Sequence, residues 1–495
     1  MEVLYEAFQA ERAMEVLAHG DRYYRAVASD GYEEVRIHLS ARLAAAGFGR
    51  TPGFELEELL VTPSTTSWTP LGAQLTLEDA EGESTELHAF DDQADVERLM
   101  LPLGTPGCSL SGPAVLSLGD VWAGSILVTE APARSDILRR AQSRGAVAVL
   151  SSSLGSYNID PETGELLEHA LRFRVYPEGE DLPVFQISRA SHAKIAAAVG
   201  AGGARVRLRA EVHVEDRPLR MLVATIAGAS RAHEAVVVSS HIEYAGASDN
   251  ASGFAATLEG AIALSNAIRE GKLQRPARSV VFLWGPQIKQ AECWMANSPR
   301  KPVAGLTLLA AGDSPAYGGS PLLLERPPDP GAVMPLHPDV HTTWGSPPVE
   351  AESLEPNGLA VVARSAMADV SGYVGGWRVA DHPWEGGSDH DVFLAAGVPA
   401  ALFWHFTSSW YHTSLDRFER IDSEELRRSG VTVLCTALAI ADPDPADFAH
   451  YDRALSVDER MRTGVAQVAG EAELVEQWRS WCSGARTWLA ELCDV

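Results

Sequence analysis

Residues 236–243 read VVVSSHIE, and this stretch decides how the chain folds. An apolar run that ends in polar residues predicts a buried strand, and the sequence SDNASG follows at 248–253. An amphipathic helix is predicted directly afterwards, over residues 251–269. A His and an Asp on loops after a buried strand are what a hydrolytic zinc site requires. We therefore expect an α/β scaffold that presents His241 and Asp249 as candidate metal ligands.

Further strand-like runs, separated by helices or long loops, continue on both sides of this stretch. They predict a doubly wound sheet with strands at 221–227, 235–240, 279–284, 305–311 and 398–406. The intervening residues 313–385 are rich in Pro and Gly, and we expect loops there with one or two strands.

The chain divides by pattern into four predicted parts. Residues 1–95 are expected to hold N-terminal helices and the first strands of the main domain. Residues 96–210 form an insert with a βαβ unit of their own, built from a strand at 124–129, a helix at 136–144 and a strand at 145–150. The main core is expected at 211–445, and a helical tail at 446–495.

The tail carries a stripe of large apolar residues at helical spacing: Leu474, Trp478, Trp481, Ala485, Trp488 and Leu492. Such a stripe indicates a helix that buries one face. We expect it to pack against its own chain, with a homodimer contact as the alternative.

Composition narrows the classes of partner. The chain has 495 residues, of which 46% are hydrophobic and 22% charged, with a formal net charge of -27. This charge argues against binding to nucleic acid or to an anionic membrane, because both would repel it. No apolar run approaches the roughly 20 residues of a membrane span. The N-terminus lacks the pattern of a signal peptide, and five scattered cysteines fit a reducing cytoplasm.

Four motifs together resemble a known superfamily. DNASG follows His241 at 249–253, VFLWG lies at 281–285, GSDH at 387–390 and YHTSLD at 411–416. Their order and spacing resemble those of the co-catalytic zinc aminopeptidases, whose superfamily includes glutamate carboxypeptidases and glutaminyl cyclases. The resemblance covers residues 210–440 and implies a three-layer αβα sandwich with a mixed sheet. The insert resembles the protease-associated domain often found inside these enzymes.

The resemblance also implies roles for particular residues. In the superfamily two zinc ions share a bridging Asp, and each ion takes one His and one further carboxylate. By motif, Asp249 is the bridge, while His241 and His412 are the imidazole ligands. Glu243 occupies the place of the outer carboxylate that orients a liganding ring.

Three acids of the superfamily pattern are missing. The general base and one ligand fall on Gln287 and Ile288, and the remaining ligand falls on Leu309. Glutamine cannot take a proton from water at neutral pH, and the two aliphatic side chains cannot bind metal. Glu292 or Asp313 could replace a lost ligand after a shift of register. Otherwise we expect one ion or none, as zinc or ferrous iron held by the two histidines and the bridge.

A second polar group lies around Asp389 and His390. The resemblance places it near bound substrate, so these residues and Gln287 are candidate catalytic groups, able to hold an amine or to transfer a proton. Asp389 could equally cap the helix that follows it. Aromatic and imidazole side chains precede His412, and we expect a substrate-binding wall from Trp404, His405, Trp410 and Tyr411.

Two functions remain open from the sequence. The first is an enzyme with an aminopeptidase-like fold that acts on a small amine- or amide-containing molecule through a rebuilt, at most mononuclear, centre. The second is a catalytically inactive pseudopeptidase that binds a peptide or a partner protein.

Overall fold

A computed structural model describes residues 1–314, 319–342 and 349–495. In this part of the chain thirteen strands form a mixed sheet. Four central strands, in the order β13-β10-β8-β9, run parallel to one another. Their bounds are Ala400–His405 (β13), Lys301–Leu309 (β10), Arg231–His241 (β8) and Arg278–Gly285 (β9). Near-continuous apolar runs build these strands, because both faces of a parallel sheet are covered.

Shorter and antiparallel strands extend this sheet on both sides. On one side β11 (Leu322–Glu325) pairs antiparallel with β13, and β12 (Val379–His382) pairs parallel with β11. On the other side β7 (Arg205–Ile226) runs antiparallel to β9. The sheet is therefore mixed, as expected, and the predicted strands at 221–227, 235–240, 279–284, 305–311 and 398–406 all fall on observed strands.

Helices cover both faces of the central sheet. Along β8, Val236 and Val238 join one apolar cluster while Val237 joins another, because successive side chains of a strand point to opposite faces. The larger cluster includes residues of α1 (Glu2–Ala7), α2 (Ala10–Asp21), α3 (Asp30–Ala45), α6 (Ala251–Arg269), α9 (Leu359–Tyr373) and α11 (Ser423–Ala441). The opposite cluster includes residues of α7 (Lys289–Asn297) and α10 (His390–Ala395). The helix predicted at 251–269 has the observed bounds.

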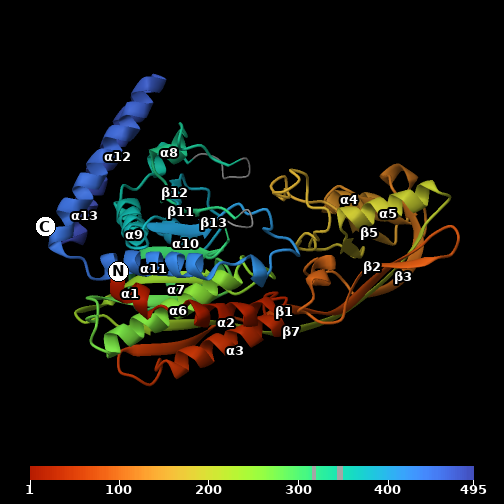
Figure 1. Ribbon diagram of the computed structural model, residues 1–495, viewed down its shortest axis with the longest axis horizontal. Helices are drawn as coiled ribbons and strands as arrows, with labels where there is room; N and C mark the ends of the chain where they lie inside the picture. Colours follow the sequence, from red (N-terminus) through yellow and green to blue (C-terminus); the bar gives the residue numbers. More distant parts are fainter. Residues whose placement is uncertain (315–318, 343–348) are drawn as a thin grey trace.

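A second lobe lies beside the sheet domain. The long strands β1 (Phe54–Glu78) and β7 pair antiparallel, and both run from the sheet domain into the second lobe (Figure 1). The lobe has an apolar cluster of its own, to which strands on both sides of its βαβ unit contribute. Its elements are β2 (Ser84–Phe90), β3 (Cys108–Val115), β4 (Ile126–Thr129), α4 (Ser135–Ser143), β5 (Ala148–Ser151), β6 (Val184–Gln186) and α5 (Arg189–Gly200). Its relation to protease-associated domains, and the four domain boundaries, stay predictions.

The C-terminal tail forms a helical hairpin of α12 (Phe448–Ala469) and α13 (Ala472–Leu492), near the short α8 (Pro330–Val333) and far from the second lobe (Figure 1). In α13, Trp478 and Trp481 are buried within the same apolar cluster as the central sheet. The tail stripe therefore packs against its own chain, as predicted. Among the described residues, none of the helices is both long and apolar enough for a membrane span.

Candidate active site

The candidate site lies where the four parallel strands end. His241 is the last residue of β8, Gln287 follows the end of β9, Leu309 ends β10, and the chain leaves β13 toward His412. Since parallel strands present their carboxyl ends at one edge of a sheet, these residues meet there. Three of them, Gln287, Leu309 and His412, line a pocket of about 250 Å³, whereas His241 is buried beside it. The other wall residues are Tyr244, Asp249, Ala310, Glu385, Gly386, Gly387, Ser388, Leu402, Trp404, Phe406 and Tyr411.

Asp249 lies between the two candidate imidazole ligands. Its Oδ2 accepts a hydrogen bond from Nε2 of His412 at 2.8 Å, while its Oδ1 lies 3.4 Å from Nε2 of His241. The carboxylate is buried, and burial alone raises its pKa, but the two imidazoles hold the pKa of Asp249 well below its usual range. Asp249 is thus an ionised carboxylate with one oxygen toward each histidine, which is the arrangement expected of a bridging residue.

His241 is enclosed without a hydrogen-bond partner. It is fully buried, and neither ring nitrogen donates to or accepts from another described group. Burial favours the neutral ring, but Asp249 and Glu243 outweigh it and raise the pKa of His241 above its ordinary value. A buried imidazole with two unsatisfied nitrogens is uncommon, and a bound ion would satisfy it.

Glu243 serves the neighbouring loop instead of the imidazole. Its Oε2 lies 3.8 Å from Nδ1 of His241, too far for a hydrogen bond, whereas its Oε1 accepts the backbone N–H of Gln287. Burial raises the pKa of Glu243 to about 7. The expected orientation of the His241 ring by Glu243 is therefore not seen in this structure.

Gln287 faces the pocket but has its polar atoms occupied. Its Oε1 accepts a hydrogen bond from the Tyr244 hydroxyl at 2.8 Å, and its Nε2 donates to Oγ of Ser388 at 3.1 Å. The amide thus joins two walls of the pocket. Since an amide cannot take up a proton at neutral pH, Gln287 positions neighbouring groups and does not act as a base.

The backbone at Ile288 is strained. Its φ of +66° and ψ of -56° put a β-branched residue in a region that L-residues rarely adopt. The N–H of Lys289 donates to the carbonyl of Gln287 at 2.7 Å, which closes a γ-turn around Ile288. Oδ1 of the buried Asp389 accepts the Ile288 N–H at 2.5 Å and so holds this conformation.

Strained residues concentrate at the pocket. Six described non-glycine residues have positive φ, and three of them (Tyr244, Ala310 and His412) line the pocket, while Ile288 follows directly after Gln287. Such strain persists only where the surrounding structure enforces it, and it clusters at functional sites. The positions of the strained residues therefore support a functional role for the pocket.

The possible replacement ligands do not complete the missing set. Glu292 lies exposed on α7. Asp313 is buried behind the pocket with Asp416, and neither carboxylate lines it. Burial raises the pKa of Asp313 to about 6 and that of Asp416 to about 8. Asp416 accepts the backbone N–H groups of Ser248 and Asp249, so it positions the loop that carries the bridging carboxylate.

Two of the four expected wall residues point away from the pocket. Along β13 and beyond it, Leu402, Trp404 and Phe406 line the pocket, and side-chain alternation turns His405 to the opposite face. There the His405 ring contacts the Ser320 carbonyl and the Ser429 hydroxyl. Trp410 packs with Leu167 and Ala170 of the second lobe. The prediction is thus corrected for His405 and Trp410, whereas Trp404 and Tyr411 do line the pocket.

Asp389 and His390 also lie behind the pocket wall. Both are fully buried, and neither is among the lining residues. Asp389 stands at the N-terminus of α10 but makes no side-chain cap; besides Ile288 it accepts a hydrogen bond from the side chain of Gln290. His390 bonds to Oε1 of Glu325 at 2.9 Å. Their placement supports a structural role and gives no support to direct proton transfer.

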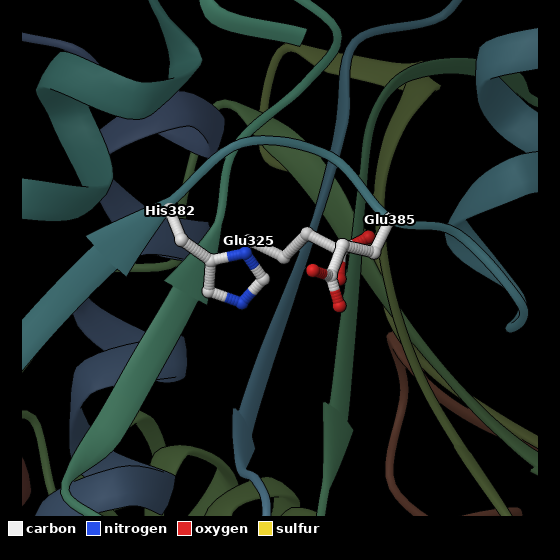
Figure 2. A group of neighbouring side chains, drawn as sticks. All are labelled: Glu325, His382 and Glu385. Atoms are coloured by element: carbon white, nitrogen blue, oxygen red, sulfur yellow. The ribbon is translucent and has the colours of Figure 1, made fainter. Parts of the chain in front are cut away.

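One group of side chains was not predicted from the sequence. Glu325, His382 and Glu385 each offer a ligand atom, and these atoms all lie within 4.8 Å of one another. Figure 2 shows the three side chains turned toward a common point, from β11, from β12 and from the loop after β12. Within the described residues this is the only group of three His, Cys or acidic side chains that meets so closely. Glu385 belongs to the pocket wall as well.

A pair of zinc ions does not fit the residues at Asp249. Each half of the centre would have one imidazole and one carboxylate oxygen, whereas a catalytic zinc takes about three protein ligands. The positions that the resemblance assigns to the third ligands hold Ile288 and Leu309, which offer no donor atom. The ligand atoms of His241, Asp249 and His412 are also not within 4.8 Å of one another as a set. A single ion between them would therefore need one imidazole to move.

Comparison with known proteins agrees with the fold. Residues 221–285 and 354–437 match the family described as peptidase family M28. No curated protein sequence matches the chain. The chain is similar to the solved structure of an aminopeptidase from Aneurinibacillus sp. strain AM-1, with 19% identity, 89% of this chain and 96% of that chain covered, and a TM-score of 0.52.

Two further solved structures give the same picture. A peptidase M28 precursor from Shewanella amazonensis SB2B is 16% identical over 89% of this chain and 95% of that chain, with a TM-score of 0.59. A zinc aminopeptidase from Bacillus subtilis is 15% identical, with 88% of this chain and 96% of that chain covered and a TM-score of 0.53. The resemblance to the co-catalytic zinc peptidase superfamily is confirmed, and the fold is that of the M28 aminopeptidases.

Proposed function

We propose that this chain, which has the M28 aminopeptidase fold, is an enzyme that acts on a small amine- or amide-containing molecule and is not an ordinary dizinc aminopeptidase. One observation carries the proposal. The pocket keeps the carboxylate of Asp249 and the imidazole of His412, but Gln287 and Leu309 stand where the superfamily has acids. The binding features are retained while the hydrolytic centre is incomplete.

The charge and the lining of the pocket favour a cationic amine. Asp249 and Glu385 contribute carboxylates, and the described lining includes no lysine or arginine. Tyr244, Trp404, Phe406 and Tyr411 supply aromatic faces, which attract an ammonium group through their quadrupoles. A small amine would thus find both an ion-pair partner and a surface for its apolar part.

The pair of Asp249 and His412 offers proton transfer. Because the ionised Asp249 can only accept, Nε2 of His412 carries the hydrogen of their 2.8 Å bond. The carboxylate therefore sets the orientation and the tautomer of the ring. The His412 side chain is 25% exposed, so it is accessible to a molecule in the pocket.

We infer that the centre at Asp249 holds at most one metal ion, because a pair lacks its third ligands. Such an ion would supply a Lewis acid or an activated water at the pocket. Asp249, Glu385 and His412 can bind an amine and hold a proton without it.

The alternative is a pseudopeptidase that binds a peptide end without cutting it. Gln287 favours it, since both ends of the amide are hydrogen-bonded and no base stands in its place. The two functions share amine recognition and differ in turnover.

Titration of L-leucinamide into the protein by calorimetry tests the shared claim, with N-acetyl-L-leucinamide as the uncharged analogue. We expect the amine to bind at least about tenfold more tightly, because a buried charge-assisted contact is worth about 1.5–3 kcal/mol. Asp249→Asn should remove this preference, and the exposed Glu292→Gln should keep it. Equal binding of the two ligands would overturn the proposal. Mass spectrometry of the amide after incubation then distinguishes the two functions, because an enzyme converts it and a pseudopeptidase leaves it unchanged.

A further inference from the structure

A group of potential ligands lies on the pocket wall away from the Asp249 centre. Glu325 is the last residue of β11, and His382 is the last residue of β12. The two are directly paired across parallel strands, so their side chains leave the sheet on the same face. Glu385 reaches the same point from the loop that follows β12 (Figure 2). Strand register, rather than sequence proximity, therefore brings the three together.

Glu325 has an oxygen that no neighbour uses. The residue is fully buried, and its Oε1 accepts hydrogen bonds from the backbone of Gly386 and from Nε2 of His390. Its Oε2 has no hydrogen-bond partner among the described residues. A buried carboxylate oxygen without a partner is costly, because it has lost its hydration and gained no replacement. A cation at this point would satisfy it.

The tautomer of the His382 ring suits ligation. Its Nδ1 lies 2.7 Å from the carbonyl oxygen of Pro383. A carbonyl can only accept, so Nδ1 carries the hydrogen, and in the neutral ring Nε2 keeps its lone pair. Metal-binding histidines commonly have such a bond from the second ring nitrogen, because it fixes the tautomer and the orientation of the ring.

Glu385 completes the group and connects it to the pocket. Its Oε1 accepts hydrogen bonds from the backbone and the hydroxyl of Thr342, at 2.7 and 2.8 Å, which orient the carboxylate. Glu385 and Trp404 both line the pocket, and the rings of Trp404 and His382 lie 6.4 Å apart. An ion held here would therefore lie at the side of the substrate pocket.

We propose that Glu325, His382 and Glu385 bind one divalent transition-metal ion, with zinc as the best-suited cation. Two ligands of one tetrahedral zinc lie about 3.4 Å apart, since each is about 2.1 Å from the ion. The ligand atoms all lie within 4.8 Å of one another, so binding requires them to approach by up to about 1.4 Å. One imidazole and two carboxylates form a three-ligand set that leaves a fourth position open. The inference goes beyond the proposed function and does not depend on the substrate; with an ion bound, Glu385 serves the ion and Asp249 is the ion-pair partner of an amine.

Zinc titration into three variants isolates this site from the Asp249 centre. The first variant, Asp249→Asn with His412→Ala, lacks the bridge and one imidazole of that centre. It should still bind one equivalent of zinc in a competition assay with a chromogenic chelator. Adding His382→Ala should weaken binding by at least about 100-fold, since removing a ligand costs more than the 10–100-fold of an outer partner. Adding His233→Ala, which removes an exposed surface imidazole, should change nothing.

Single variants of the otherwise unchanged chain provide a control in case the double variant does not fold. His382→Ala and Glu325→Gln should each remove one equivalent of zinc while far-ultraviolet circular dichroism stays that of the wild type. The inference is overturned if the wild type and His382→Ala bind zinc with the same affinity and number. It is equally overturned if the wild type binds no zinc, or if His412→Ala alone removes all of it.

Discussion

The carboxylate of Asp249 is joined directly to the imidazole of His412 by a hydrogen bond of 2.8 Å. The opposite oxygen of Asp249 faces His241, so the carboxylate has the geometry of a bridging ligand. The positions that the resemblance assigns to further acids hold Gln287, Ile288 and Leu309. On this basis we propose a centre that cannot hold two ions.

Cleavage of chromogenic aminoacyl anilides by the wild type should be negligible. A positioned general base contributes about 10²–10⁴ to the rate, and Gln287 cannot supply it. The loss of metal ligands lowers the rate further. Spectrophotometric assays with added zinc measure this directly. Robust turnover that a chelator abolishes would show that other residues replace the lost acids.

Restoring the acids should require all three changes together. Gln287→Glu, Ile288→Glu and Leu309→Asp in one chain should raise anilide hydrolysis and zinc content, whereas each single change should leave both near the wild-type level. The reason is that a base and its metal ligands act as one unit. A single change that gave the full activity would contradict this view of the pocket.

Substitutions at Ile288 should reveal its strained backbone. Ile288→Gly and Ile288→Ala both delete the side chain, but only glycine adopts positive φ without cost. We expect the glycine variant to be more stable than the alanine variant by about 1 kcal/mol in chemical denaturation. At position 291, inside α7, the order of stability should be reversed. The Ala291→Gly variant should be less stable than the wild type with alanine there, because glycine destabilises a helix interior by about 1 kcal/mol. Equal stability of the two Ile288 variants would contradict the strain.

The sequence predicted the fold well because its signals are local. The apolar runs of the central strands and the amphipathic pattern of 251–269 each reflect a periodicity that the observed element shares. The positions of Gln287 and Leu309 were also predictable, since each lies at or shortly after the end of a buried strand. Both residues line the pocket together with Asp249.

The features of the site that the sequence did not predict depend on contacts between residues far apart in the chain. Glu325 and His382 are far apart in the chain, and only the pairing of β11 with β12 makes them neighbours. The orientation of His405 could have been predicted from the sequence. Because side chains alternate along a strand, His405 and its neighbour Trp404 point to opposite faces of the sheet. Asp389 could not be assigned from the sequence either, because its partner Ile288 lies on another loop.

Acidification should destabilise the protein partly through His405. Burial lowers the pKa of His405 to about 4, against about 6.5 in an unfolded chain. The unfolded state thus binds the proton first, so this stability is present above about pH 6.5 and is lost as the pH falls toward 4. At pH 5 the loss should be about 2 kcal/mol relative to pH 8.

The His405→Gln variant provides the comparison, because glutamine can occupy both hydrogen bonds but does not titrate in this range. Urea denaturation at pH 8 and pH 5 should show a smaller decrease in the free energy of unfolding for the variant. Parallel decreases in the two proteins would rule out His405 as the source.

The tail should contribute strongly to stability through Trp478. This side chain is 3% exposed, and the guanidinium of Arg462 lies 5.0 Å from its ring centroid. Trp478→Ala should cost about 3–5 kcal/mol in the free energy of unfolding, the usual range for a buried aromatic residue. Trp488→Ala, at a half-buried position of the same helix, should cost clearly less. Similar small losses for both would mean that the tail is only loosely attached.

An anomalous difference map at the zinc absorption edge, from crystals grown with zinc, tests the altered centre most directly. We predict at most one peak at the residues His241, Asp249 and His412, and a separate peak between Glu325, His382 and Glu385. Two peaks about 3.5–4 Å apart, one on each side of Asp249, would show an intact two-metal hydrolytic centre and contradict the loss of its ligands.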